Sequence, residues 1–203
     1  MSIESDITDS LDKTRAEAAM RSYTPKGTVR CAGTPLFRTE LARDYGCLLD
    51  LDAEVIRWSC LQSEFTDGRF VHIPDFLIER RSGWVFVDVL DENLPLPRVS
   101  IKELLGNTPH EFVTAHEIEA GFRLQNAKDL LRYAHWRTPL GDRLRLLAAL
   151  DEHGSLSMAE CLTIFRETLP IAGLASLILH RFIEIELDIE LINPDTTVRR
   201  NRD

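Results

Sequence analysis

The sequence has no apolar stretch near the roughly 20 residues needed to span a bilayer, so no transmembrane helix is expected. Its first 20 residues are acidic and polar and lack the apolar segment of a secretory signal. The four cysteines are scattered, with no CxxC or Cys/His pair, which argues against a zinc site and for reduced, mostly buried thiols. We find no internal repeat or low-complexity tract. We therefore expect a cytoplasmic globular protein.

Basic residues are also in short supply: 24 Lys and Arg stand against 33 Asp and Glu, which gives a net charge of −9. Because neutralisation of phosphate by Lys and Arg supplies most non-specific affinity for DNA, so acidic a chain is a poor stand-alone DNA binder. Contact with DNA would need a local basic patch or a partner that brings the DNA. The 203 residues suffice for one large domain or two small ones.

Hydrophobic periodicity predicts a mixed α/β core over residues 37–138, preceded by a polar N-terminal arm, 1–36, without a sustained period. An amphipathic helix is expected over residues 39–52, at the start of the core. Segments rich in Val, Ile, Phe and Trp are expected to be strands, and these are 55–61, 70–81 and 84–90.

The second and third of these strands are separated by a Ser-Gly turn signal, which predicts a hairpin, with Pro74 interrupting its first arm. Residues 111–122 then read as a strand and a short helix. Thr114 and Glu117 fit a capping box, in which each side chain binds a free backbone N–H of the first turn. Residues 125–136 predict a further helix, so the core combines a mixed sheet with flanking helices.

A Pro-Leu-Gly sequence marks a boundary, and we interpret residues 139–203 as a second, smaller domain. Three helices are expected there, the second opening with a capping box of Ser157 and Glu160. Residues 183–191 alternate strictly between apolar and acidic side chains, which predicts one half-buried strand. Three short helices followed by a β segment are the outline of a winged-helix module.

The surface expected for this module suits protein better than DNA. Its third helix, within residues 170–182, is almost wholly apolar, and the alternating segment carries four acids on one face. Such a face repels phosphate. The basic tail with Arg199, Arg200 and Arg202 is expected to be a frayed terminus.

Asp75 and Asp88 are the candidate site residues. An acid at a strand bend that faces an acid on the neighbouring strand can hold one Mg²⁺, and metal-dependent phosphodiester cleavage needs such a cation. The PD-(D/E)XK nucleases use this layout, with a lysine two residues after the second acid. Taken alone, the two acids favour the simpler interpretation, in which Asp75 makes a turn hydrogen bond beside Pro74 and Asp88 lies at a solvated strand edge.

Several ordered motifs strengthen the nuclease interpretation, because together they resemble the TnsA-type transposon endonucleases. The resemblance implies a restriction-endonuclease-like core followed by a winged-helix domain that engages other transposition proteins. It runs loosely from residue 36 to residue 200. The segments that carry it are TELARDYGCLLDLDAEV (39–55), IPDFLI (73–78), VFVDVL (85–90), FVTAHEI (112–118) and NAKDLLRY (126–133).

Transferred residue by residue, the family's catalytic set is incomplete. Asp75 and Asp88 match its two acids, but Ala42 stands where the helix glutamate is expected and Leu90 where the lysine is expected. Glu40 should face away from Ala42, roughly 200° around the helix, although a two-step shift of the alignment would make it the missing glutamate. Lys102 is the only substitute lysine we considered. Loss of a catalytic charge costs orders of magnitude in rate.

The resemblance therefore implies a TnsA-like protein of a mobile-element or phage context, catalytically impaired, that acts through a transposase subunit or an ATPase and through DNA in their company. No cofactor is expected, and Mg²⁺ at Asp75 and Asp88 is the alternative. Two other functions stay open, namely an active Mg²⁺-dependent endonuclease of a heteromeric transposase and a DNA-binding or inhibitory regulator. Whether the chain is an enzyme is left open.

Overall fold

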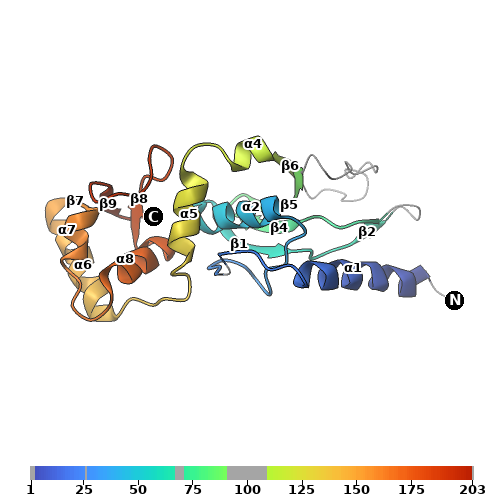
Figure 1. Cartoon of the computed structure of the whole chain (residues 1–203), viewed down its shortest axis with the longest axis horizontal. Helices are drawn as coiled ribbons and strands as arrows, with labels where there is room; N and C mark the ends of the chain where they lie inside the picture. Colours follow the sequence, from blue (N-terminus) through green and yellow to red (C-terminus); the bar gives the residue numbers. More distant parts are fainter. Residues whose placement is uncertain (1–2, 26, 67–70, 91–108, 203) are drawn as a thin grey trace. The chain divides into compact units, whose positions relative to one another are not determined.

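The computed structural model of the chain describes residues 3–25, 27–66, 71–90 and 109–202. They form two compact units (Figure 1). The first contains the residues up to Thr24 together with Arg30–Glu119, and the second contains Pro25–Val29 and the residues from Ala120 onward. The contacts between residues therefore place the division after residue 119, whereas the sequence boundary was expected at the Pro-Leu-Gly sequence that begins at residue 139.

The first unit is a mixed α/β structure, with a mixed sheet flanked by helices. Its elements are α1 (Ile3–Ala19), α2 (Glu40–Leu51), β1 (Val55–Cys60), β2 (Phe65–Thr66), β3 (Val71–His72), β4 (Phe76–Arg80), β5 (Gly83–Leu90), β6 (His110–Thr114) and α4 (Ala115–Ile118). The main sheet has the order β1-β4-β5-β6, and β2 pairs only with β3. The pairs β1–β4 and β4–β5 are antiparallel, while β5 and β6 run parallel.

The expected hairpin is confirmed as β4 and β5, which pair from Phe76 with Val87 to Arg80 with Gly83. Gly83 has a φ of 128°, which other residues adopt only with strain, so it belongs at the turn. Pro74 lies in the irregular residues between β3 and β4, as expected. The hairpin register matters for the site because it brings the residue before Phe76 beside the residue after Val87.

Helix α2 packs on this sheet through aromatic side chains. Phe76 of β4 meets the rings of Tyr45 and Trp58 edge to face, at centroid distances of 5.4 and 5.7 Å. Buried Asp50 of α2 accepts a hydrogen bond of 2.9 Å from the indole N–H of Trp58. The side chain of Thr39 caps the first turn of α2 by accepting from Ala42 N at 3.0 Å. These contacts fix the start of α2 against the sheet.

The second unit combines four helices and a three-stranded sheet among its described residues. Its elements are α5 (Arg123–Leu131), α6 (Leu140–His153), β7 (Ser155–Ser157), α7 (Met158–Leu162), α8 (Pro170–Leu179), β8 (Ile183–Ile185) and β9 (Thr197–Arg200). The sheet has the order β7-β9-β8 and is antiparallel. Both expected capping boxes are present, at Thr114 with Glu117 and at Ser157 with Glu160.

The four helices of this unit, α5 to α8, and its three strands follow the chain in the order α5, α6, β7, α7, α8, β8 and β9. Pro170 occupies the first turn of α8, where its missing N–H has no helical partner to lose. Asn126 of α5 is buried and holds the chain after β8: its side-chain amide donates to Leu187 O and Glu190 O, and its carbonyl accepts from Ile192 N. These bonds tie the first helix of the unit to the segment after its second strand.

Three expectations are corrected by the structure. The strand predicted over 183–191 ends at Ile185, because the side-chain bonds of Asn126 and of Glu186 pair the following backbone in an irregular conformation. The basic tail is not frayed, since Arg199 and Arg200 belong to β9. Residues 3–19 form a helix that the polar sequence of the arm did not predict. The segment ENLPLPRVS (92–100), whose two prolines predict a loop, lies outside the described residues.

No described helix combines the length and the apolar character required to cross a membrane. The four cysteines form no disulfide with one another, and three of them are buried while Cys31 is partly buried, as expected.

Candidate functional site

The hairpin places Asp75 and Asp88 side by side. Asp75 lies at a bend directly before β4, and Asp88 lies in β5, opposite that bend in the antiparallel register. The backbone N–H of Asp75 donates to Asp88 Oδ1 at 3.2 Å, and the N–H of Val89 donates to Asp75 Oδ2 at 2.9 Å. Both carboxylates are buried. The two acids selected from the sequence therefore meet in one site.

Arg38 is the third member of the site. It directly precedes Thr39, the residue that caps α2, so the start of that helix fixes its position. Its Nε donates to Asp75 Oδ1 at 2.8 Å, and its terminal nitrogen lies 3.3 Å from Asp88 Oδ1. One guanidinium thus bridges the two carboxylates, where a hard cation would have to bind both.

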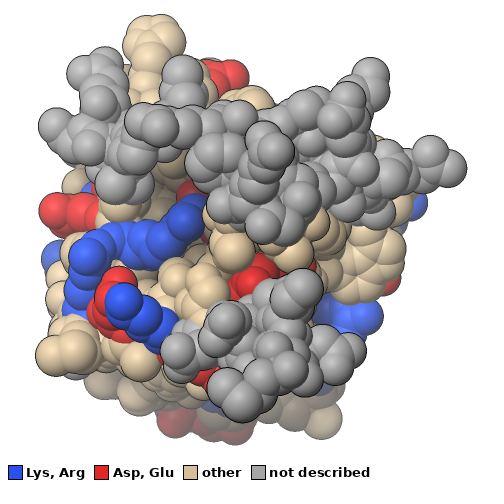
Figure 2. All heavy atoms as spheres, turned by 90° about the vertical axis from the view of Figure 1, so that its right-hand side faces the viewer, with Lys and Arg blue, Asp and Glu red and all other residues tan. Residues whose placement is uncertain are grey.

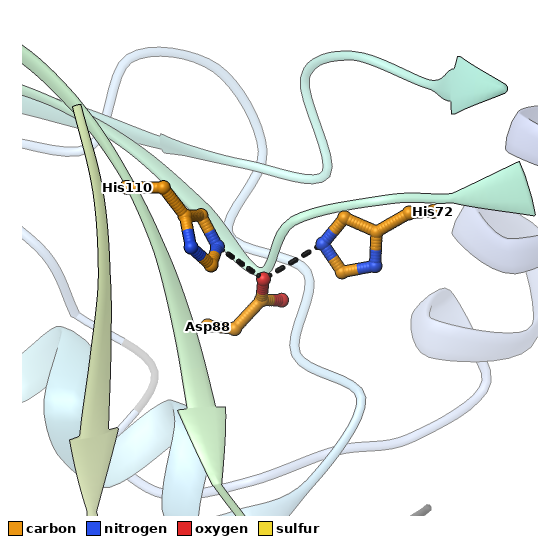
Figure 3. Close-up of side chains that lie close together, drawn as sticks. All are labelled: His72, Asp88 and His110. Atoms are coloured by element: carbon orange, nitrogen blue, oxygen red, sulfur yellow. Dashed lines mark hydrogen bonds and ion pairs between the residues drawn. The ribbon is translucent and has the colours of Figure 1, made fainter. Parts of the chain in front are cut away.

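Two histidines complete the site on the other oxygen of Asp88. The Nε2 atoms of His72 and His110 each lie 2.7 Å from Asp88 Oδ2 (Figure 3). His72 ends β3 and His110 begins β6, so three different strands supply the three side chains. The side chains of His72, His110 and Asp88 are 10%, 8% and 5% exposed, respectively, so little water competes for these contacts.

The pKa values of the two carboxylates are shifted in opposite directions by their surroundings. Burial by itself raises the pKa of Asp88, but the hydrogen bonds from His110 and His72, with the charge of Arg38, outweigh it and lower that pKa to about 2. For Asp75, burial prevails over the charge and hydrogen bond of Arg38, so its pKa lies above the ordinary value. Burial lowers the pKa of Arg38, but the two carboxylates more than offset this and raise it, so Arg38 stays charged.

Ala42 and Leu90, the positions at which the family resemblance expects a glutamate and a lysine, provide no charge. Ala42 is buried in α2, and Leu90 ends β5 opposite Thr114 of β6. Glu40 is directed outward, as expected, with its side chain 72% exposed and paired with Arg43 at 2.7 Å. Lys102, the substitute lysine considered from the sequence, lies outside the described residues.

Sequence reasoning found the two acids and missed the nitrogen-bearing side chains that bind them. His110 shares no local spacing with Asp88, and the two meet only because β6 pairs in parallel with β5, Phe86 lying opposite His110. His72 was visible as the neighbour of the Pro-Asp pair, two residues before Pro74. Arg38 carried one usable signal, its place directly before a threonine cap, but that position alone does not identify a partner.

Figure 2 shows one face, on which Lys and Arg form a short band with acidic side chains beside it. Arg80, which ends β4 beside the hairpin turn, is paired with Glu111 at 3.1 Å. No protein-family model matches the chain, and no curated protein sequence matches it either.

Proposed function

We propose that this chain is a TnsA-like protein with a nuclease-type core that does not cut DNA and acts through protein partners. The observation that carries the proposal is the bridge from Arg38 to Asp75 and Asp88. A guanidinium in that position neutralises the carboxylates that would bind Mg²⁺, and it can neither activate a water molecule nor accept a proton. Arg38 thus supplies positive charge beside the two carboxylates, as Mg²⁺ would, but it does not supply the chemistry of cleavage.

The surrounding elements support the same proposal. An opening helix, α2, is followed by the antiparallel strands β1, β4 and β5 and by the parallel strand β6, and the two acids lie at the β4–β5 pair. This is the order that the TnsA resemblance leads us to expect. Ala42 and Leu90 add no metal ligand or proton carrier. A restriction-endonuclease-like core without complete nuclease chemistry accounts for all of these features.

For the second unit we propose a winged-helix domain. The order α6-β7-α7-α8-β8-β9 and the sheet order β7-β9-β8 support it. The helix that would read DNA in such a module is α8, but its residues 172–179 are all buried, and Ile171 and Leu169, which are exposed, are apolar. A helix with so little polar exposed surface is poorly suited to contact bases or phosphates.

A groove of about 600 Å³ in the second unit supports binding to a protein instead. Its lining is mainly apolar, and it includes Leu130, Tyr133, Met158, Leu162, Ile171 and Ala175. An apolar segment of a transposase subunit or of an ATPase is the partner we propose, with DNA approached through that partner because the net charge is −9. A cytoplasmic location is part of this proposal.

Cleavage assays test the proposed loss of chemistry. Purified full-length protein is incubated with supercoiled plasmid and Mg²⁺ or Mn²⁺, beside Asp75→Ala. We expect no nicking by either protein. Metal-dependent nicking by the wild type that is absent from Asp75→Ala would refute the proposal and favour the active endonuclease. Arg38→Ala is expected to gain Mn²⁺ binding at Asp75 and Asp88, because it removes the cation that now joins them.

Co-purification tests the proposed partner. Wild-type protein and the variants Ile171→Asp and Ile189→Asp are used as bait in cells that contain the neighbouring genes. Both isoleucines are exposed in the second unit, but only Ile171 lines the groove, so Ile189→Asp is the matched control. We expect a transposase or ATPase with the wild type and the control and not with Ile171→Asp. Direct, salt-sensitive binding of DNA by the isolated full-length protein would favour the regulator instead.

A further inference from the structure

The arrangement of His72 and His110 around Asp88 has the composition of a transition-metal site. One ligand atom from each of the three residues lies within 4.8 Å of the other two (Figure 3). Both imidazoles present Nε2 to the same carboxylate oxygen, from different strands. Imidazole nitrogen with carboxylate oxygen suits Zn²⁺, Mn²⁺ or Fe²⁺, whereas Mg²⁺ and Ca²⁺ prefer oxygen ligands alone.

The ligand atoms are close enough to converge on one ion. Metal–ligand bonds of about 2.0–2.2 Å place neighbouring ligands of a tetrahedral or octahedral ion roughly 3.0–3.4 Å apart. Each histidine nitrogen now lies 2.7 Å from Asp88 Oδ2. Withdrawal of each imidazole by less than about 1 Å would therefore open the space for an ion, without any change in the pairing of β5 with β6.

Charge and burial also favour a cation here. Two carboxylates, those of Asp75 and Asp88, share one guanidinium, that of Arg38, at a buried site. Arg38 contacts Oδ1 of Asp88, whereas the histidines contact Oδ2, so the guanidinium and a metal ion would use different oxygens. The bridge that removes the Mg²⁺ site of a nuclease is thus compatible with a different metal on the other side of Asp88.

We propose that His72, Asp88 and His110 bind one divalent transition-metal ion, for which Zn²⁺ is the probe. Each histidine would coordinate through Nε2 with its proton on Nδ1, and water would complete the coordination. The ion would join β5 and β6, which are neighbours in the main sheet, to β3, which pairs with β2. This inference does not rest on the proposed function, since it needs neither cleavage nor a partner.

Metal titration of the full chain tests the proposal. Protein stripped with a chelator is titrated with Zn²⁺ and, separately, with Mg²⁺ by isothermal calorimetry. We expect one Zn²⁺ per chain and at least tenfold weaker binding of Mg²⁺. The variants His72→Gln and His110→Gln keep a hydrogen-bond donor for Asp88 but lose the imidazole, so they should retain the fold. Each should weaken Zn²⁺ binding at least as much as the roughly 10- to 100-fold that loss of a supporting residue costs.

His116→Ala is the matched control, because His116 is exposed on α4 in the same unit and lies outside the cluster. It should bind Zn²⁺ like the wild type. No Zn²⁺ binding by the wild type, or an equal loss in His116→Ala and the two glutamine variants, would overturn the proposal. Circular dichroism of each variant identifies unfolding, and for an unfolded variant a Zn²⁺-soaked crystal of the wild type decides: an anomalous peak beside Asp88 supports the site, and its absence overturns it.

Discussion

The Nε atom of Arg38 lies 2.8 Å from Oδ1 of Asp75, and this contact joins the start of α2 to the bend before β4. The side chain of Asp75 is 7% exposed, and that of Arg38 is 31% exposed. A buried carboxylate with a charged donor at this distance depends on that donor for its stability, because removal of one partner leaves the other buried and uncompensated.

Arg38→Ala should therefore destabilise the protein by on the order of 3 kcal/mol. Arg57→Ala is the matched control, since Arg57 pairs with Glu79 on the sheet surface with 55% of its side chain exposed. That control should cost less than about 1 kcal/mol. Urea unfolding followed by circular dichroism measures both. Equal losses in the two variants would show that the Arg38 bridge contributes no more than a surface ion pair.

Asp88 should make the stability depend on acidity in a defined direction. Its pKa is lowered to about 2, below the ordinary value for aspartate, mainly because the hydrogen bonds from His110 and His72 outweigh burial. A lowered carboxyl pKa gives stability that is fully present above the ordinary value, near 4, and is lost as the pH falls toward 2. The corresponding contribution is about 2 kcal/mol.

Unfolding of the wild type and of Asp88→Asn between pH 6 and pH 2 measures this contribution. The difference in unfolding free energy should shrink as the pH falls through that range. For Asp75→Asn the sign is reversed. Because burial raises the pKa of Asp75, acidification relieves its buried charge, so the wild type should gain stability relative to Asp75→Asn as the pH falls. A constant difference between the wild type and Asp88→Asn would contradict the assigned direction.

The elements that the sequence predicted correctly are those with local causes. The hairpin of β4 and β5 follows from alternating apolar residues around a turn, and the capping boxes follow from pairs three residues apart. The strand expected over 183–191 failed beyond Ile185 because Asn126, far away in the sequence, binds its backbone. Side-chain bonds of this kind leave no trace in local periodicity.

Of the site, too, only the part with a local cause could be predicted from the sequence. Asp75 and Asp88 were found because the register of one hairpin determines their separation. Arg38 reaches Asp88 from the segment directly before α2, and His110 reaches it from the parallel strand β6, through sequence separations of 50 and 22 residues. No spacing rule in a single sequence connects such positions, so these partners of Asp88 could be found only from the structure.

The cap that Ser157 provides for α7 should contribute measurably to the stability of the second unit. Its side chain accepts from Glu160 N at 3.3 Å, and Glu160 accepts from Ser157 N at 2.8 Å, which satisfies two free N–H groups at the start of α7. Ser157→Ala should lower the free energy of unfolding by about 1 kcal/mol. Ser155→Ala, at an exposed position of β7, should change it by less than half as much. Thermal unfolding of both variants compares them, and a larger effect at Ser155 would count against the cap.

Asp142 holds the chain that leads into α8. Its carboxylate is fully buried and accepts from the backbone N–H groups of Arg166, Glu167 and Thr168 at 2.8, 3.0 and 3.0 Å, and from the side chain of Arg145 at 2.7 Å. Four donors on one carboxylate make this the best-satisfied buried acid described in the second unit. They also explain why the pKa of Asp142 is lowered although burial opposes this.

Asp142→Ala should therefore cost roughly 3 kcal/mol, because it leaves three backbone donors without their acceptor. Asp129→Ala is the control, since Asp129 is a partly exposed acid of α5 whose bond to Gln125 lies on the surface. It should cost less than about 1 kcal/mol. Urea unfolding distinguishes them, and hydrogen exchange should show the N–H groups of residues 166–168 losing protection first. Unchanged protection there, with a large loss of stability, would mean that Asp142 acts through Arg145 instead of through the loop.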